Sequence, residues 1–215
     1  NVGGGLTLLQ DIFDSSNAVQ GLELLILLDS RANIRKETGT EIIFINKLQR
    51  FYLFFKLLKL LKSNDTVLFF GNLPPLMKLK NKSYLFLQNR FLINYVSTKG
   101  FPFSSRLRIN LERIIFFLFK NNVEKIIVQS ESMSDQLSSF SLKREIIKLP
   151  FIQSIEFEDN YEVREREGFV YIATEEVHKN HETLIESWIL LAEEGLYPEL
   201  TLTIKKTGSI YRKYK

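Results

Sequence analysis

The feature that most constrains the fold of this chain is a repeated alternation between short apolar runs and stretches of helical periodicity. Each run is almost wholly apolar rather than alternating apolar with polar residues, which is typical of strands buried on both faces of a parallel sheet. A parallel sheet of this kind is covered by helices on both sides. We therefore predict a doubly wound, Rossmann-like α/β domain over residues 1–150. The strands are expected at residues 22–28, 41–45, 66–70, 83–87 and 125–128, and the helices at 6–18, 47–62, 106–120 and 132–139.

The pattern changes after residue 150. Residues 151–167 are charged and weakly periodic, which is typical of a connection between domains. A strand at 169–173, a helix ending near Glu194 and a strand at 200–204 then restart the alternation. We predict that residues 168–215 begin a second Rossmann-like domain.

Three glycines, Gly3 to Gly5, stand at the start of the first expected helix. Without Cβ atoms they allow the backbone to approach a ligand closely, and the helix N-terminus adds a partial positive charge that suits phosphate. The sequence is neither GxGxxG nor a P-loop, so a simple tight turn is the alternative. Because such a turn normally follows a strand, we expect that the first strand is missing. The sequence also stops soon after the second domain begins, so we expect that the rest of that domain is missing too. The sequence is then a piece of a longer protein.

Composition narrows the classes of function. The 215 residues are 45% hydrophobic and 25% charged, which indicates a globular chain. With no cysteine, disulfide frameworks and thiolate metal sites are excluded, and a reducing cytosol is favoured. The net charge of +4 favours anionic partners without choosing among phosphates, nucleic acid and lipid. Lysine or arginine interrupts every apolar run before the ~18 residues that a membrane span needs.

Both histidines and the only tryptophan lie in one stretch, FVYIATEEVHKNHETLIESWILLAEEG, residues 169–195. Leu184, Trp188 and Leu191 share one helical face, so this helix can pack on the strand before it. Its turn, which contains His178, Lys179 and His181, follows the carboxyl end of a strand, where ligands bind in open α/β sheets. A lysine at a helix start is unfavourable unless an anion shares the site. A solvated lysine, a plain helix start and a metal pair are the alternatives. The metal is disfavoured because no third ligand is evident.

Four segments in chain order resemble bacterial glycosyltransferases of the family 4 type, which have the two-Rossmann-domain GT-B fold. NVGGGLTLL is similar to the glycine loop of that family, and VLFFGNLPPL followed by YLFLQNRFLI is similar to two successive strand ends that face the interdomain cleft. IIVQSESMSDQL resembles a later strand and helix start. FVYIATEEVHKNHETLIESWILLAEEGLYPELTLTI resembles the start of the nucleotide-sugar-binding domain. The resemblance implies that residues 1–150 form the acceptor-side domain.

The resemblance also implies roles for individual residues. Lys179 and Asn180 occupy the turn that contacts the donor diphosphate, and Gly4 and Gly5 lie in the loop that faces the same phosphates. His178 and His181 are expected to support this turn locally.

On the acceptor side of the cleft the resemblance places Asn72, Gln88 and Asn89. Many relatives have a histidine near the reacting sugar where Gln88 and Asn89 stand, and an arginine before the lysine where Thr174 and Glu175 stand. The missing histidine puts a direct base role at Gln88 and Asn89 in doubt, although an amide can still orient a hydroxyl. We expect Asn72, Gln88, Lys179 and the glycines to converge on one cleft.

The function implied is hexosyl transfer from a nucleotide diphosphate donor to a hydroxyl of a cell-surface polysaccharide, such as lipopolysaccharide, or of a lipid-linked precursor, with retention at the anomeric carbon. No metal and no further cofactor is expected. The glutamate-rich donor motif is expected after Lys215, so this sequence alone should be inactive. A catalytically decayed nucleotide-binding or scaffold module of the same fold is the alternative. A nucleic-acid binder ranks last, because the aromatic residues lie inside apolar runs.

The expected location is the cytoplasm, with peripheral association at the inner face of the cell membrane. The basis is the segment KLQRFYLFFKLLKLLK, residues 47–62, in which basic residues interrupt a strongly apolar helix. Basic residues near an apolar surface attract anionic head groups. An ordinary covering helix with solvated lysines is the alternative for this segment.

Overall fold

The computed structural model describes residues 4–17, 19–30, 32, 40–46, 55, 57–94, 97–140, 144–150 and 167–215. The chain divides into two compact units. The first comprises Asn1–Ser97 with Ser104–Gln153, and the second comprises Thr98–Phe103 with Ser154–Lys215. The division near residue 153 lies inside the stretch that the sequence assigned to a connection.

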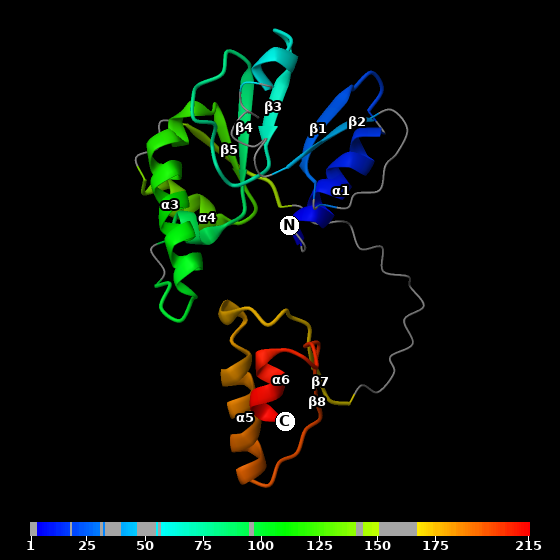
Figure 1. Cartoon of the computed structure of the whole chain (residues 1–215), viewed down its shortest axis with the longest axis vertical. Helices are drawn as coiled ribbons and strands as arrows, with labels where there is room; N and C mark the ends of the chain where they lie inside the picture. The colour runs from blue at the N-terminus through cyan, green and yellow to red at the C-terminus, as the bar shows by residue number, and fades with distance from the viewer. Residues whose placement is uncertain are drawn as a thin grey trace. The chain divides into compact units, whose positions relative to one another are not determined.

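The first unit contains two parallel sheets (Figure 1). One pairs β1 (Leu24–Asp29) with β2 (Thr40–Ile45), and the other has the order β3-β4-β5-β6. The members of the second sheet are β3 (Thr66–Phe69), β4 (Lys82–Leu87), β5 (Lys125–Val128) and β6 (Glu145–Lys148). The predicted α/β class and the parallel pairing are confirmed. No described strand joins β1 to β3, so the described strands of this unit form two sheets.

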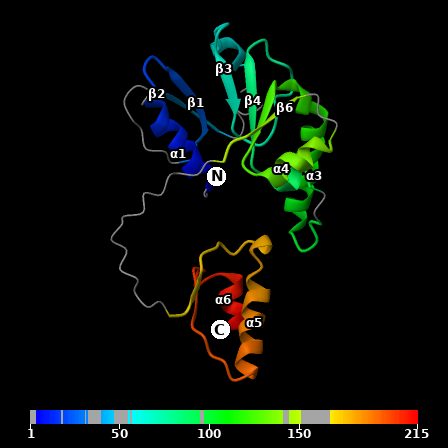
Figure 2. The ribbon, with the colours of Figure 1, turned by 180° about the vertical axis from the view of Figure 1, so that it is seen from behind.

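Helices α3 (Phe103–Phe119) and α4 (Glu131–Ser138) cover one face of the four-stranded sheet, as Figures 1 and 2 show. Leu85 and Leu87 point to the same face because side chains alternate along a strand. Both are fully buried, and they belong to one cluster with Phe116 of α3 and Leu137 of α4. This cluster is the largest described core of the unit, and it fixes the carboxyl ends of β4 and β5.

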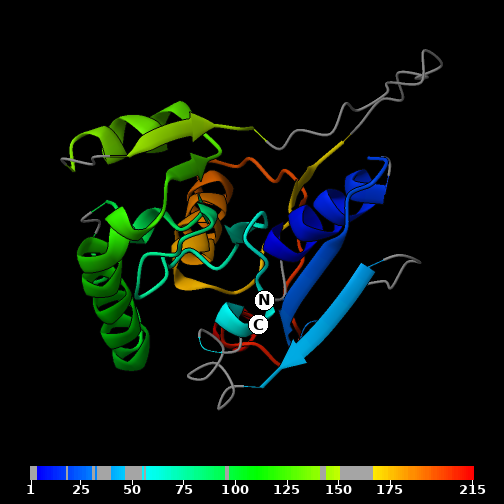
Figure 3. The same ribbon diagram turned by 90° about the horizontal axis from the view of Figure 1, so that it is seen from above.

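Helix α1 (Gly4–Asn17) covers the two-stranded sheet and lies along β1 in Figure 3. Phe13 of α1 is fully buried against Ile26 and Leu28 of β1. A third cluster, built on Leu57 and Val67, connects β1 with β3, since Leu27 packs against it. Most of the predicted helix at 47–62 lies outside the described residues. Residues 57–60 are helical.

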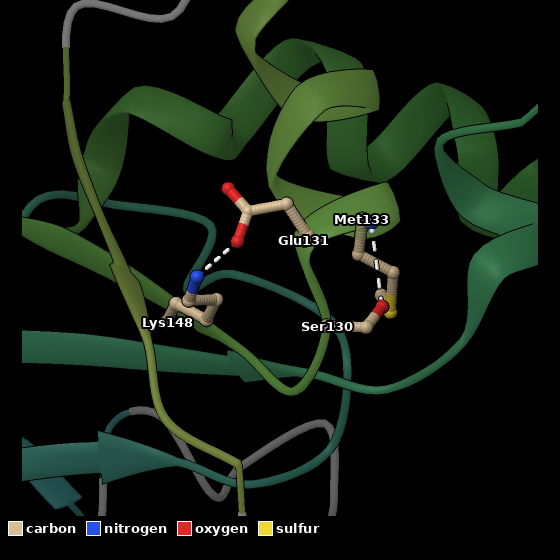
Figure 4. A network of polar contacts seen from close by, with 4 residues as sticks. All are labelled: Ser130, Glu131, Met133 and Lys148. Atoms are coloured by element: carbon tan, nitrogen blue, oxygen red, sulfur yellow. Dashed lines mark hydrogen bonds and ion pairs between the residues drawn. The ribbon is translucent and has the colours of Figure 1, made fainter.

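Ser130, which follows β5 in the chain, caps the N-terminus of α4 with its side chain (Figure 4). Its Oγ atom accepts a hydrogen bond at 3.4 Å from the backbone N–H of Met133. Glu131, in the first turn, pairs with Lys148 of β6. Capping by serine and an acidic residue in the first turn both stabilise a helix N-terminus. The start of α4 is therefore held at the carboxyl ends of β5 and β6.

The second unit contains one parallel pair, β7 (Phe169–Tyr171) with β8 (Leu200–Leu202). Between them lie the short 3-10 turn η3 (Val177–Lys179) and helix α5 (His181–Glu193), and α6 (Ser209–Tyr214) follows β8. Trp188 packs edge-on against Phe169, with ring centroids 5.3 Å apart, and its Nε1–H donates to the carbonyl of Pro198 at 2.8 Å. The predicted packing of this helix on the strand before it is confirmed.

Candidate functional site

Two groups of the predicted residues lie at carboxyl ends of parallel strands, one group in each unit. In the first unit the turn after β3 and the turn after β4 are neighbours, since the two strands pair in register from Thr66–Lys82 to Phe69–Leu85. Asn72 lies in the first turn, and Gln88 and Asn89 lie in the second. This end of the sheet is where ligands bind in open α/β folds.

Asn72 connects the two turns. Its backbone has φ 67°, the left-handed conformation that asparagine tolerates better than most residues. Its Oδ1 atom accepts hydrogen bonds from the backbone N–H groups of Gln88 at 2.7 Å and Asn89 at 2.9 Å. Asn89 in turn caps the 3-10 turn η1 (Arg90–Leu92), accepting from the N–H of Phe91 at 3.1 Å. The backbone of Gln88 is thereby held at a fixed place on the sheet edge.

The first turn of α1 reaches this same edge. A Cβ atom at Gly5 would lie 3.2 Å from Oε1 of Gln88, which is tighter than an ordinary contact. The structure therefore brings together Gly5, Asn72, Gln88 and Asn89. Gly4 begins α1 beside Gly5, and Gly3 lies outside the described residues.

Arg113 of α3 supports the segment that follows Asn89. Its Nε atom donates to the carbonyl of Phe91 at 2.6 Å, and Nη2 donates to the carbonyl of Asn94 at 3.2 Å. Sequence reasoning did not identify this residue. Its partners lie about twenty positions away in the chain, so no local spacing signals the contact.

In the second unit the turn between β7 and α5 adopts a defined conformation. Asn180 has φ 54° and ψ 40°, which allows the chain to turn sharply from η3 into α5. Its side chain does not cap the helix backbone. Instead Oδ1 accepts from the hydroxyl of Thr183 at 3.0 Å. The first N–H groups of a helix have no partner within the helix. No described side chain caps α5, so these N–H groups can meet an external acceptor or water.

Tyr171 and His181 form the floor of this turn. The hydroxyl of Tyr171 donates to the carbonyl of Lys179 at 2.6 Å, and its ring meets the imidazole of His181 edge-on with centroids 5.2 Å apart. His181 is only 2% exposed, and its Nε2 atom has no hydrogen-bond partner among the described residues. A buried polar atom without a partner is costly, so such an atom in a native structure calls for an explanation.

Lys179 and His178 both belong to η3, the turn before Asn180. Lys179 is half-buried, and it precedes the residue at the helix start rather than lying in the first helical turn. The exposed His178 lies 3.5 Å from the carboxylate of Glu176. His181 is buried and His178 is exposed, and the supporting role expected of both stays a prediction.

Glu175 links this turn to the next one. Its carboxylate accepts a hydrogen bond from the backbone N–H of Ser209 at 3.1 Å, at the start of α6, and lies against Gly208. Lys213 of α6 pairs with Glu182 of α5 at 3.1 Å, and the two helices lie side by side in Figures 1 and 2. Glu175 lies in the region where many of the glycosyltransferases that this sequence resembles have an arginine. In this chain the carboxylate has a structural partner, the backbone N–H of Ser209.

Whether the groups in the two units face one cleft stays a prediction. Within the described residues, no group of three or more His, Asp or Glu side chains is arranged to hold a metal ion. The described helices are also too short or too polar to cross a membrane.

Comparisons with known proteins do not assign the chain to a family. No family model, curated protein or solved structure matches it at a significant level.

Proposed function

We propose that this chain belongs to a GT-B glycosyltransferase that moves a hexosyl group from a nucleotide diphosphate donor to a hydroxyl of a cell-surface polysaccharide or a lipid-linked precursor, with retention at the anomeric carbon. The observation that carries the proposal is the turn from β7 to α5. It combines a lysine, uncapped helix N–H groups and a buried imidazole nitrogen without a partner at the carboxyl end of a parallel strand pair.

Two of these groups, the helix N–H groups and the lysine, suit a diphosphate. The N-terminus of α5, a helix of 13 residues, offers backbone donors and a partial positive charge. Lys179 adds a full positive charge one residue before Asn180, the N-cap of α5. When the bond between sugar and diphosphate breaks, negative charge develops on the leaving phosphate. Donors already oriented toward that charge stabilise the transition state electrostatically.

The edge of the first unit supports the acceptor side of the proposal. Asn72 fixes the backbone at Gln88, and the amide of Gln88 lies beside the start of α1. An amide is not a strong base, so the role we assign to Gln88 is to orient an acceptor hydroxyl. Gly4 and Gly5 begin the helix at this edge, and the absence of a Cβ atom at Gly5 lets the Gln88 side chain approach closely.

The test uses the natural gene product that contains this sequence, assayed with a panel of nucleotide sugars for transfer and for donor hydrolysis. Lys179→Ala should lower kcat/KM by roughly 10- to 100-fold, because one charged hydrogen bond contributes ~1.5–3 kcal/mol. Lys179→Arg should retain most of the activity. Lys82→Ala is the matched control, since Lys82 is an exposed lysine at the amino end of β4.

Two results would contradict the proposal. Equal kcat/KM values for wild type and Lys179→Ala would make Lys179 an ordinary surface lysine. Donor binding without turnover of any nucleotide sugar would instead favour a decayed binding module of the same fold.

A further inference from the structure

Tyr171, the last residue of β7, contacts the turn before α5 on both sides of Asn180. Its hydroxyl donates to the backbone carbonyl of Lys179 at 2.6 Å. Its ring meets the imidazole of His181 edge-on, with centroids 5.2 Å apart. One half-buried side chain of the strand therefore reaches the residue before the N-cap and the residue after it.

The peptide unit between Lys179 and Asn180 is bonded at both ends. Its carbonyl accepts from the hydroxyl of Tyr171, and its N–H donates to the carbonyl of Val177 at 3.2 Å. The C=O and N–H groups of a planar trans peptide point in opposite directions. A half-turn of this unit would therefore break both hydrogen bonds.

This peptide unit also joins the two kinds of donor in the proposed diphosphate site. Lys179 precedes it, and the N–H groups at the start of α5 follow it. Its orientation therefore sets the angle between the lysine and the helix start. Asn180 does not oppose a rotation, because its φ of 54° would become negative, the range that most residues prefer. Residues in sparsely populated conformations persist where neighbouring contacts fix them.

We propose that Tyr171 is a positioning residue of the diphosphate site. Its hydroxyl fixes the peptide unit after Lys179, so that the lysine and the first N–H groups of α5 meet the same phosphate group. In this role Tyr171 acts through Lys179 and needs no contact with the ligand. The inference rests on the proposed function, since it requires that the turn from β7 to α5 binds a diphosphate.

Glu175 is a second side chain that anchors this turn. Its carboxylate accepts from the backbone N–H of Ser209 at 3.1 Å. That anchor lies where the chain enters the turn, before η3. It leaves the orientation of the peptide unit after Lys179 to Tyr171.

The experiment is an NMR titration of the isotopically labelled 215-residue chain with inorganic pyrophosphate, followed at the backbone amides of residues 178–183. Tyr171→Phe removes only the hydroxyl and can keep the ring contact with His181. It should raise the dissociation constant about 5-fold, because one neutral hydrogen bond holds the peptide unit. Trp188→Phe is the matched control. It also removes one hydrogen bond to a backbone carbonyl, that of Pro198, and should bind pyrophosphate like wild type.

A double-mutant cycle separates positioning from a general loss of stability. In a Lys179→Ala background the charge that the turn orients is gone. Tyr171→Phe should then change the dissociation constant by less than about 2-fold. Urea unfolding of the same variants shows whether binding follows stability, and Tyr171→Phe should weaken binding more than Trp188→Phe does at an equal loss of stability.

Three results would overturn the proposal. If wild type binds pyrophosphate and Lys179→Ala weakens binding, but Tyr171→Phe does not, Tyr171 has no positioning role and the proposed function stands. If Tyr171→Phe weakens binding equally in both backgrounds, or if Trp188→Phe weakens it as much, the hydroxyl does not act through Lys179. If wild type does not bind pyrophosphate, the proposed function fails and this inference fails with it.

Discussion

The side chain of Asn72 holds the main chain of Gln88 in place, with Oδ1 of Asn72 accepting the N–H of Gln88 at 2.7 Å. A second bond, from the N–H of Asn89, ends on the same oxygen at 2.9 Å. The backbone of Asn72 is itself in the left-handed region. One residue therefore combines two hydrogen bonds between strand ends with a backbone conformation that few side chains adopt.

Substitutions at Asn72 separate these two contributions. Asn72→Gly removes both hydrogen bonds but suits the left-handed backbone, so it should lower the free energy of unfolding by ~1–3 kcal/mol. Asn72→Ala adds the backbone cost and should lower it by ~2–4 kcal/mol. Asn72→Asp keeps an acceptor and should stay within ~1 kcal/mol of wild type. Urea unfolding measures the free energy of unfolding of each variant. Hydrogen exchange at the backbone amides of Gln88 and Asn89 shows whether the loss of stability lies at these strand ends. Equal stability of the Ala and Asp variants would show that the bonds contribute nothing.

A double-mutant cycle at Glu175 and Gly208 tests the contact between the turn that precedes α5 and the turn that precedes α6. A Cβ atom at position 208 would collide with the Glu175 carboxylate, and we expect the carboxylate to release the N–H of Ser209 as it moves away. Gly208→Ala should therefore cost ~0.5–1.5 kcal/mol, the value of one hydrogen bond. In a Glu175→Ala background the same change should cost almost nothing. Thermal unfolding of the four proteins gives the coupling, and strictly additive effects would rule out the contact.

His181→Phe separates folding from ligand binding. Phenylalanine can retain the edge-on contact with Tyr171 and removes a buried nitrogen that has no partner among the described residues. The free energy of unfolding should therefore stay equal or rise by up to ~1 kcal/mol. Binding of a nucleoside diphosphate, measured by calorimetry, should weaken at least about 10-fold if Nε2 meets the ligand. If His181→Phe binds the nucleoside diphosphate as tightly as wild type, His181 contributes only to packing and not to ligand binding.

The ion pair between β5 and β6 predicts a pH dependence at the alkaline end. Lys125 and Glu145 are directly opposite in register, with Nζ and Oε2 2.8 Å apart, and the hydrogen bond to Glu145 raises the pKa of Lys125. A raised lysine pKa stabilises the fold fully below the unfolded value of about 10.4, and the contribution is lost as pH rises through the folded value. Wild type should exceed Glu145→Gln in melting temperature at neutral pH, and the difference should vanish above that range. A difference that persists there would mean that the pair does not act through the lysine charge.

Most of the fold could be predicted because its strands are continuous apolar runs, which is the pattern of a parallel sheet. The structure places β1, β3, β4 and β5 within two residues of the predicted bounds. The strand β6 was not predicted, since its two isoleucines stand between Glu145 and Lys148 and resemble a charged loop. Helix α6 was also missed, because it is six residues long and mostly polar.

For the candidate site, too, local patterns could be predicted and tertiary contacts could not. Positions at strand ends could be predicted, since a strand followed by a turn with asparagine or glycine is a local pattern. The partners that fix those positions could not. Tyr171 contacts Lys179 only because the turn folds back on its strand, and Glu175 reaches Ser209 across 34 residues. Contacts of this kind depend on tertiary packing and leave no local spacing in the sequence.

The central claim is that the turn from β7 to α5 binds a diphosphate, and the most direct measurement is an NMR titration of the isotopically labelled chain with inorganic pyrophosphate. The backbone amides of residues 178–183 should shift in a saturable way, and Lys179→Ala should raise the dissociation constant by at least about 10-fold. Lys82→Ala should leave the titration unchanged. If the amides at the start of α5 do not respond, or respond equally in wild type and Lys179→Ala, the turn is not a diphosphate site and the proposed function is contradicted.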